Sequence, residues 1–219
     1  GKQYEQDLEK NSIYVVNKFH HESHRTGRCL VFITPNSERT MGTYLGASEM
    51  LEFSMDFMDA VNNSKILFTE GYQFTSDQNF KAFISVLENT DPNVQLALSL
   101  SDPFVVSNFK SRFEDVFSKR IVDYVFCNKE EAIAMAGENF VEGLSRISKN
   151  FVVTDGANSS VISEEGNISE IEAHAVKAID SNGAGDIYAG SVLHKIVQGK
   201  NFRKACEFGN FASSIIVQE

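Results

Sequence analysis

Short apolar runs alternate with amphipathic segments through most of the chain. Four runs are typical of buried strands, and seven longer segments place their apolar side chains at helical spacing. The predicted strands are residues 66–68, 95–100, 124–126 and 151–153; the predicted helices are residues 48–61, 76–88, 103–117, 129–136, 140–147, 186–197 and 202–217. This alternation predicts βαβ units with a parallel sheet covered on both faces, which is an α/β fold.

Two pairs of extended runs flank turn-forming sequences. Residues 28–34 and 39–45 are joined by Pro35-Asn36-Ser37-Glu38, which predicts a hairpin. Residues 161–163 and 168–171 predict a second hairpin near one edge of the sheet.

Composition narrows the class of protein. The 219 residues are 42% hydrophobic and 23% charged, which suits one large globular domain. The net charge of -10 disfavours nucleic acid and anionic membranes as partners, and no apolar run approaches the roughly 20 residues that span a bilayer. Cys29, Cys127 and Cys206 lie far apart, so we expect reduced thiols and a cytoplasmic protein.

Candidate chemistry gathers in the segment from Asp180 to Gly190. Gly183, Ala184 and Gly185 form a turn without large side chains, and a helix follows. The free N–H groups and the dipole of that helix would make the turn an anion hole for a transferring phosphoryl group. Asp186 beside the hole is either a base that takes a proton from an attacking hydroxyl or merely a helix cap, and spacing alone leaves both open.

Residues 180–190 resemble the D-T-x-G-A-G-D signature of the PfkB, or ribokinase-like, family of carbohydrate and nucleoside kinases, with Ser181 in place of the threonine. Residues 38–41, 100–104 and 123–132 also follow the family's order, and residues 43–47 and 70–72 look like its adenosine-kinase-like branch. The resemblance implies a ribokinase-like three-layer α/β/α fold with a mostly parallel central sheet and a small β lid. It implies a core of residues 1–27 and 46–219, lacking the family's N-terminal part, and a lid hairpin of residues 28–45.

The resemblance also implies roles around phosphate. Asp186 would be the catalytic base, and Gly183, Ala184 and Gly185 would form the anion hole. Arg39 would come down with the lid onto phosphate, although an exposed arginine paired with a carboxylate is nearly as good an interpretation.

Further expected roles concern the cofactors ATP and Mg²⁺. Asn128 and Glu131 match an N-x-x-E motif that would order magnesium through water, and they could equally cap the following helix. Asp180 is the candidate for a monovalent cation such as K⁺. The expected nucleotide contacts are Thr154, Gly156, Asn182 and Asn210.

The implied activity is transfer of the γ-phosphate of ATP to a hydroxymethyl group of a small-molecule nucleoside or sugar, with adenosine as the preferred acceptor. The alternatives are a fructokinase- or ribokinase-type sugar kinase and a non-catalytic nucleotide-binding member of the fold. Either a monomer or a homodimer is compatible with the sequence. His20, His21, Glu22 and His24 fit no standard metal spacing, so we expect an exposed loop there.

Overall fold

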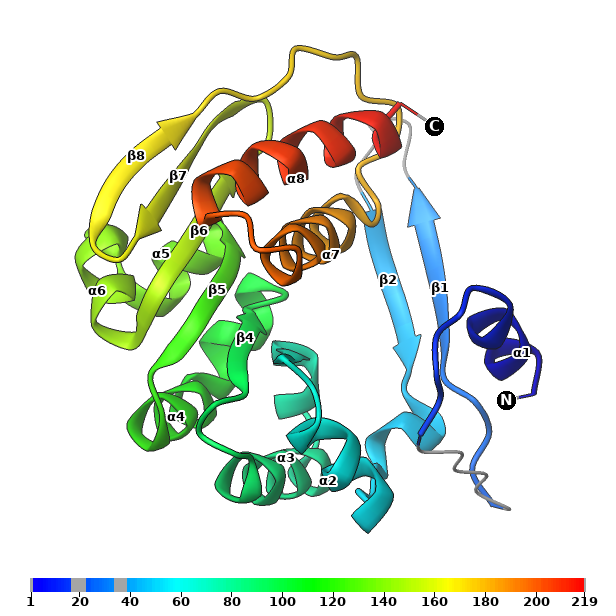
Figure 1. Ribbon diagram of the computed structural model, residues 1–219. Coiled ribbons are helices and arrows are strands. Elements are labelled where there is room, and N and C mark those ends of the chain that lie inside the picture. The colour runs from blue at the N-terminus through cyan, green and yellow to red at the C-terminus, as the bar shows by residue number, and fades with distance from the viewer. Residues whose placement is uncertain (1, 17–22, 34–38, 219) are drawn as a thin grey trace. The chain divides into compact units, whose positions relative to one another are not determined.

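The computed structural model describes residues 2–16, 23–33 and 39–218 (Figure 1). The chain forms two compact units: Gly1–Ser64 with Ser76–Asp91, and Lys65–Thr75 with Pro92–Glu219. The predicted division into a core and a lid of residues 28–45 stays a prediction.

The second unit is built on a mixed sheet. Among the described residues its strands are β3 (Ile66–Glu70), β4 (Gln95–Ser99), β5 (Val122–Asn128), β6 (Ser148–Asp155), β7 (Asn158–Glu164) and β8 (Asn167–Ile171). They lie side by side in chain order, parallel from β3 to β6 and antiparallel from β6 to β8. The predicted parallel sheet with an added hairpin is therefore confirmed.

Helices cover both faces of this sheet. The helical elements of the unit are η2 (Gly71–Phe74), α4 (Pro103–Lys119), α5 (Lys129–Ala136), α6 (Phe140–Ile147), α7 (Ala184–Val197) and α8 (Phe202–Ile216). On one face Phe126, Val152 and Ile162 form a core cluster with Tyr188 of α7 and Cys206 of α8. Successive side chains of a strand point to opposite faces, so the alternate buried residues of β5 and β6 face the side where α5 and α6 contact these strands.

The first unit is smaller and mainly helical. It contains α1 (Lys2–Lys10), β1 (Arg28–Ile33), β2 (Arg39–Tyr44), η1 (Gly46–Glu49), α2 (Met55–Asn62) and α3 (Asp77–Asn89). Strands β1 and β2 pair antiparallel, which confirms the predicted hairpin. Ser76 caps α3 by accepting a hydrogen bond from the Asn79 N–H, as the sequence predicted.

Two predicted helix boundaries are wrong. The helix expected over residues 48–61 is interrupted, because Ser54 accepts a hydrogen bond from Phe57 N and starts α2 at Met55. Upstream, the Leu51 N–H donates to Asn79 Oδ1 at 2.9 Å instead of continuing a helix. The other error concerns α7, which begins at Ala184 rather than at Asp186.

The described helices include none that combines the length and apolar character needed to cross a bilayer.

Candidate active site

The N-terminus of α7 carries the predicted phosphate turn. Gly183 is the N-cap in the left-handed region, with φ of 73°, so Ala184 and Gly185 already belong to the first helical turn. The first N–H groups of a helix lack intrahelical acceptors. A Cβ built on Gly183 or Gly185 would meet no atom within 4 Å, so the space beside this turn is open. The expected loop is thus a helix start, whose first N–H groups can bind an anion. The Ala184 N–H already donates to Ser181 O at 3.3 Å.

Asp186 is the third residue of α7 and is exposed. No hydrogen bond or ion pair involves its carboxylate among the described residues, and Gly183, the N-cap, has no side chain to compete with it. The cap is therefore Gly183, which removes the interpretation of Asp186 as the cap residue. An exposed carboxylate beside a set of free N–H groups is available to accept a proton.

The loop before this helix is shaped by Asp180. Its Oδ1 accepts a hydrogen bond from Asn182 N at 2.9 Å, and its Oδ2 accepts one from Asn182 Nδ2 at 3.1 Å. The backbone N–H groups of Ile179 and Asp180 both donate to Val217 O at the end of α8. Asp180 and Asn182 therefore hold the turn from which Gly183 starts α7.

Asn128 and Glu131 form a capping box at the start of α5. Asn128 Oδ1 accepts from Glu131 N at 2.9 Å, and Glu131 Oε2 accepts from Asn128 N at 3.1 Å. Burial raises the pKa of Glu131 to about 7, the Asn128 N–H lowers it, and the charges of Asp102 and Glu130 raise it further. The cap that the sequence suggested is present, and it leaves a buried carboxyl group that can gain or lose a proton near neutral pH.

Three site residues were missed by the sequence analysis. Burial raises the pKa of Tyr72 to about 12, and the negative charges of Asp102, Glu131, Glu70 and Asp186 raise it as well. Burial followed by the charge of Asp186 also raises the pKa of Glu70. Glu70 ends β3 and Asp102 follows β4, so a carboxylate follows each of two neighbouring parallel strands. That position is the signal that could have found them, since ligands of open α/β sheets bind at the carboxyl ends of the strands.

Tyr72 also fixes the backbone around Asp102. Its hydroxyl donates to Ser101 O at 3.3 Å, and Ser101 has a φ of 75°, which is uncommon for a residue other than glycine. Asp102 caps α4 by accepting from Phe104 N and Val105 N. Gly71 allows the start of η2 to lie close to the chain after β4, because a Cβ on Gly71 would lie 2.6 Å from Leu100 O.

The other residues predicted for the site lie at the carboxyl end of β6 or on other elements. Thr154, at the end of β6, donates through Oγ1 to Cys127 O, and Gly156 turns the chain towards β7 with φ of 56°. Asn210 on α8 donates to Glu172 O and accepts from Ser160 Oγ, so its amide is already engaged within the protein. Arg39 lies in β2, but its side chain is outside the described part of the structure.

The carboxylates suit a hard divalent cation. Glu70, Asp102, Glu131 and Asp186 offer only oxygen ligands, which Mg²⁺ prefers. Burial is the main cause that raises the pKa of Glu70 and of Glu131, and the charges of neighbouring carboxylates raise both further. A cation would favour the charged form of both groups. The described residues contain no ready-made group of three metal ligands, so a direct protein cage is absent there. A water-mediated Mg²⁺ site fits this set better than direct ligation, since Mg²⁺ keeps several waters in most proteins.

The chain as a whole matches a family of carbohydrate kinases. Residues 1–219 match the pfkB family of carbohydrate kinases, and the chain belongs to that family. Adenosine kinase 1 of Arabidopsis thaliana is 25% identical over 244 residues, which cover 100% of this chain and 69% of the relative.

Solved structures agree on the fold. The adenosine kinase from Sinorhizobium meliloti has a TM-score of 0.90 and 27% identity, covering 100% of this chain and 69% of that one. The probable sugar kinase from Rhizobium etli CFN 42 has a TM-score of 0.89 and 26% identity, covering 100% and 68%. The ribokinase-like α/β/α fold and the family are thereby confirmed. The chain spans 69% of the length of the Arabidopsis relative and 61% of that of the adenosine kinase from Schizosaccharomyces pombe.

Proposed function

We propose that the protein transfers the γ-phosphate of ATP to a hydroxymethyl group of a nucleoside, with adenosine as the acceptor. The observation that carries this proposal is the start of α7, where the exposed Asp186 carboxylate stands beside the Gly183 cap and the free N–H groups of the first turn. The similarity to adenosine kinases of several organisms supports the acceptor class.

In this mechanism Asp186 accepts the proton of the acceptor hydroxyl as that oxygen attacks the γ-phosphorus. The N–H group of Gly185 would face the negative charge that grows on the transferring phosphoryl group. The Ala184 N–H, which donates to Ser181 O at 3.3 Å, would join it by exchanging that acceptor for phosphate. A fixed donor such as the Gly185 N–H needs no reorganisation during the reaction, so it stabilises the transition state more than the ground state. The chain's own contribution is therefore positioning and electrostatic stabilisation, as expected for phosphoryl transfer.

Glu131 and Asp102 would hold Mg²⁺ through water beside the phosphates. When bound, the metal would neutralise charge on the phosphate oxygens. The hydrogen bond from Asn128 N keeps the Glu131 carboxylate oriented, and Tyr72 keeps the backbone of Asp102 in place. Thr154 and Gly156, at the neighbouring strand end, are proposed to contact the nucleotide. Asp180 is proposed to bind K⁺, and Asn182 and Asn210 are proposed to contact the nucleotide.

Within the same class, a sugar of the ribose or fructose type is the second candidate acceptor, because the probable sugar kinase from Rhizobium etli CFN 42 is as similar in fold as the adenosine kinases. Measuring activity with each acceptor distinguishes a nucleoside kinase from a sugar kinase. The full-length protein should be given ATP and Mg²⁺ with adenosine, inosine, ribose or fructose, and ADP release should be followed.

We expect the highest kcat/KM with adenosine. A higher kcat/KM with ribose or fructose would mean that the acceptor is a sugar rather than a nucleoside. The proposed phosphotransfer itself would still hold. ATP binding without turnover on any acceptor would contradict the catalytic role and favour a nucleotide-binding protein.

A further inference from the structure

Lys129 lies where strands β5 and β6 end side by side (Figure 1). It is the first residue of α5 and follows Asn128, which pairs with Thr154 across the two strands. Lys129 Nζ and Asp155 Oδ2 are 3.0 Å apart and form an ion pair, whose side chains are 51% and 32% exposed. An ion pair this exposed contributes at most about 1 kcal/mol to stability. Stability therefore gives little reason for a lysine at this position.

The surroundings of Lys129 are strongly acidic. We compared the ends of β3 to β6, the turns after them and the start of α7, which together are residues 69–76, 99–106, 127–132, 154–158 and 180–187. These segments contain one lysine, which is Lys129, no arginine and seven acidic residues: Glu70, Asp102, Glu130, Glu131, Asp155, Asp180 and Asp186. The phosphates of ATP are negative, so a site made of these carboxylates alone would repel them. Lys129 is the side chain of these segments that can attract them.

The side chain of Lys129 points towards β6. Its ammonium group meets Asp155, which stands between Thr154 and Gly156, the two residues proposed to contact the nucleotide. Residues two apart on a helix do not face each other, so Lys129 and Glu131 point to different sides of α5. The ammonium group therefore lies beside the proposed nucleotide contacts, while Glu131 is left to the proposed Mg²⁺ site.

We propose that Lys129 binds the phosphates of ATP that remain on ADP, and that Asp155 holds its ammonium group at the edge of the site. This inference rests on the proposed phosphotransfer from ATP. An ammonium group has three N–H donors, so the ion pair with Asp155 leaves donors for phosphate oxygens. Hydrogen bonds between charged partners of this kind are among the strong ones. Because ATP and ADP share these phosphates, Lys129 contributes to the binding of both.

Two variants separate this role from a structural one. Lys129→Gln should raise the Kd for ATP and the Kd for ADP about tenfold each. Its kcat should fall by less than about fivefold, because the start of α7 and Mg²⁺, rather than Lys129, face the transferring group. Asp155→Asn removes the group that competes with phosphate for the ammonium, so it should lower both Kd values about twofold. Isothermal titration calorimetry on the full-length protein with Mg²⁺ measures them, and thermal unfolding shows whether each variant keeps its fold.

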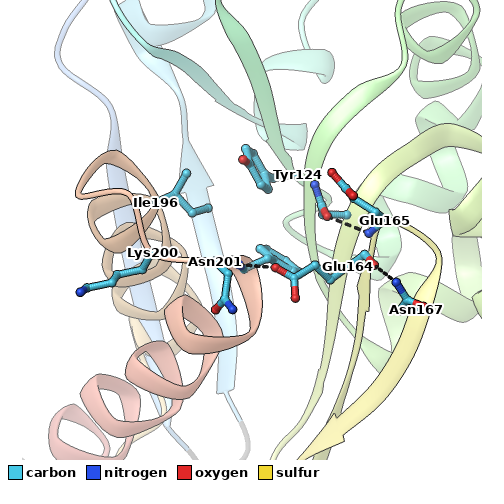
Figure 2. A pocket seen from close by; sticks show the side chains of 9 residues that line it. Tyr124, Glu164, Glu165, Asn167, Ile196, Lys200 and Asn201 are labelled. Carbon is cyan, nitrogen blue, oxygen red and sulfur yellow. Dashed lines mark hydrogen bonds between the residues drawn. The ribbon is translucent and has the colours of Figure 1, made fainter.

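The matched control is Lys200→Gln, which removes the same charge elsewhere. Lys200 is exposed and lines a hollow with Tyr124 and Asn150, and Figure 2 shows its side chain directed away from the other charged side chains there. Tyr124 and Asn150 pair across β5 and β6 four residues before the strand ends at Asn128 and Thr154, which is on the order of 13 Å away. The Kd for ATP should therefore change by less than about twofold in this variant.

Each result bears on Lys129 separately from the proposed function. An unchanged Kd for ATP in Lys129→Gln, with turnover by the natural protein, would overturn the role of Lys129, and the proposed phosphotransfer would still hold. Equal weakening of ATP binding in Lys129→Gln and Asp155→Asn would mean that the ion pair is only structural. A larger loss of affinity for ATP than for ADP would assign Lys129 to the transferred phosphate and contradict the inference. A natural protein that binds neither nucleotide would overturn both proposals.

Discussion

The Glu131 side chain has two roles. It caps the start of α5, and it is proposed to hold magnesium through water. Its capping role requires a hydrogen-bond acceptor, which either protonation state provides through a carboxyl oxygen. Its metal-ordering role requires the charged form, and burial disfavours that form without a cation. The apo protein is therefore expected to hold a proton on Glu131 that the cation would release.

The pH dependence of stability tests this state of Glu131. Its folded pKa of about 7 lies above the ordinary value of 4.5, so the folded protein binds more protons than the unfolded chain between these pH values. The free energy of unfolding should then fall as the pH rises from about 4.5 to about 7, by no more than about 1.4 kcal/mol per pH unit from this group. Urea unfolding without Mg²⁺ should show a steeper fall in the natural protein than in Glu131→Gln, which keeps a capping acceptor. Parallel curves for the two proteins would contradict the raised pKa.

Gly183 gives a second test at the residue scale. Its φ of 73° disfavours any side chain, although the surrounding space is open. Gly183→Ala should therefore lower the free energy of unfolding by about 1 kcal/mol through backbone strain alone.

The matched control is Gly190→Ala, inside α7, where an added Cβ also meets open space and φ is not positive. It should raise stability by about 0.5–1 kcal/mol, because alanine favours helix over glycine. Chemical denaturation of both variants measures the difference. Equal effects at the two positions would mean that the left-handed cap is not formed in solution.

At the scale of elements, sequence predicts best where local signals agree. Helices α5 and α6 begin and end where predicted, since Asn128 caps the first and Gly137 ends it. The prediction fails at residues 50–54, where a distant side chain, Asn79, takes the backbone N–H of Leu51. Helical periodicity cannot show such a partner, because it comes from another element.

The junction of η2 with β4 carries a prediction at this scale. A Cβ on Gly71 would lie 2.6 Å from Leu100 O and 2.7 Å from the Phe113 ring. Gly71→Ala should push the turn away from the strand and cost about 1–3 kcal/mol of stability, as overpacking usually does. Because Tyr72 follows directly, the same change should raise the KM for ATP-Mg²⁺ by moving Asp102. An unchanged KM in a destabilised variant would mean that the turn at Gly71 does not position the active site.

The second unit has the expected α/β arrangement, because strands β3 to β6 are parallel and helices stand between successive strands in the chain. The phosphate turn, Asp186 and the Asn128–Glu131 pair could be predicted because each is a short motif. Glu70, Tyr72 and Asp102 could not be predicted in the same way. They are isolated residues on different elements, and only the folded sheet brings their charges near one another.

The core of the second unit should determine its stability. Phe151 on β6 is fully buried, whereas Phe104 on α4 is 70% exposed. Phe151→Ala should cost about 3–5 kcal/mol through lost burial and a residual cavity. Phe104→Ala should change stability by less than about 0.5 kcal/mol. Urea denaturation of both variants measures the contrast, and similar losses would contradict the packing described for β6.

The most direct test of the proposed phosphotransfer compares the full-length protein with its Asp186→Asn variant. ADP formation with ATP, Mg²⁺ and adenosine should be measured together with the Kd for ATP in the same samples. We predict that kcat falls by about 10²–10⁴-fold, because the base is removed, while the Kd for ATP changes little. An Asp186→Asn variant that keeps its kcat would contradict the assignment of Asp186 as the catalytic base.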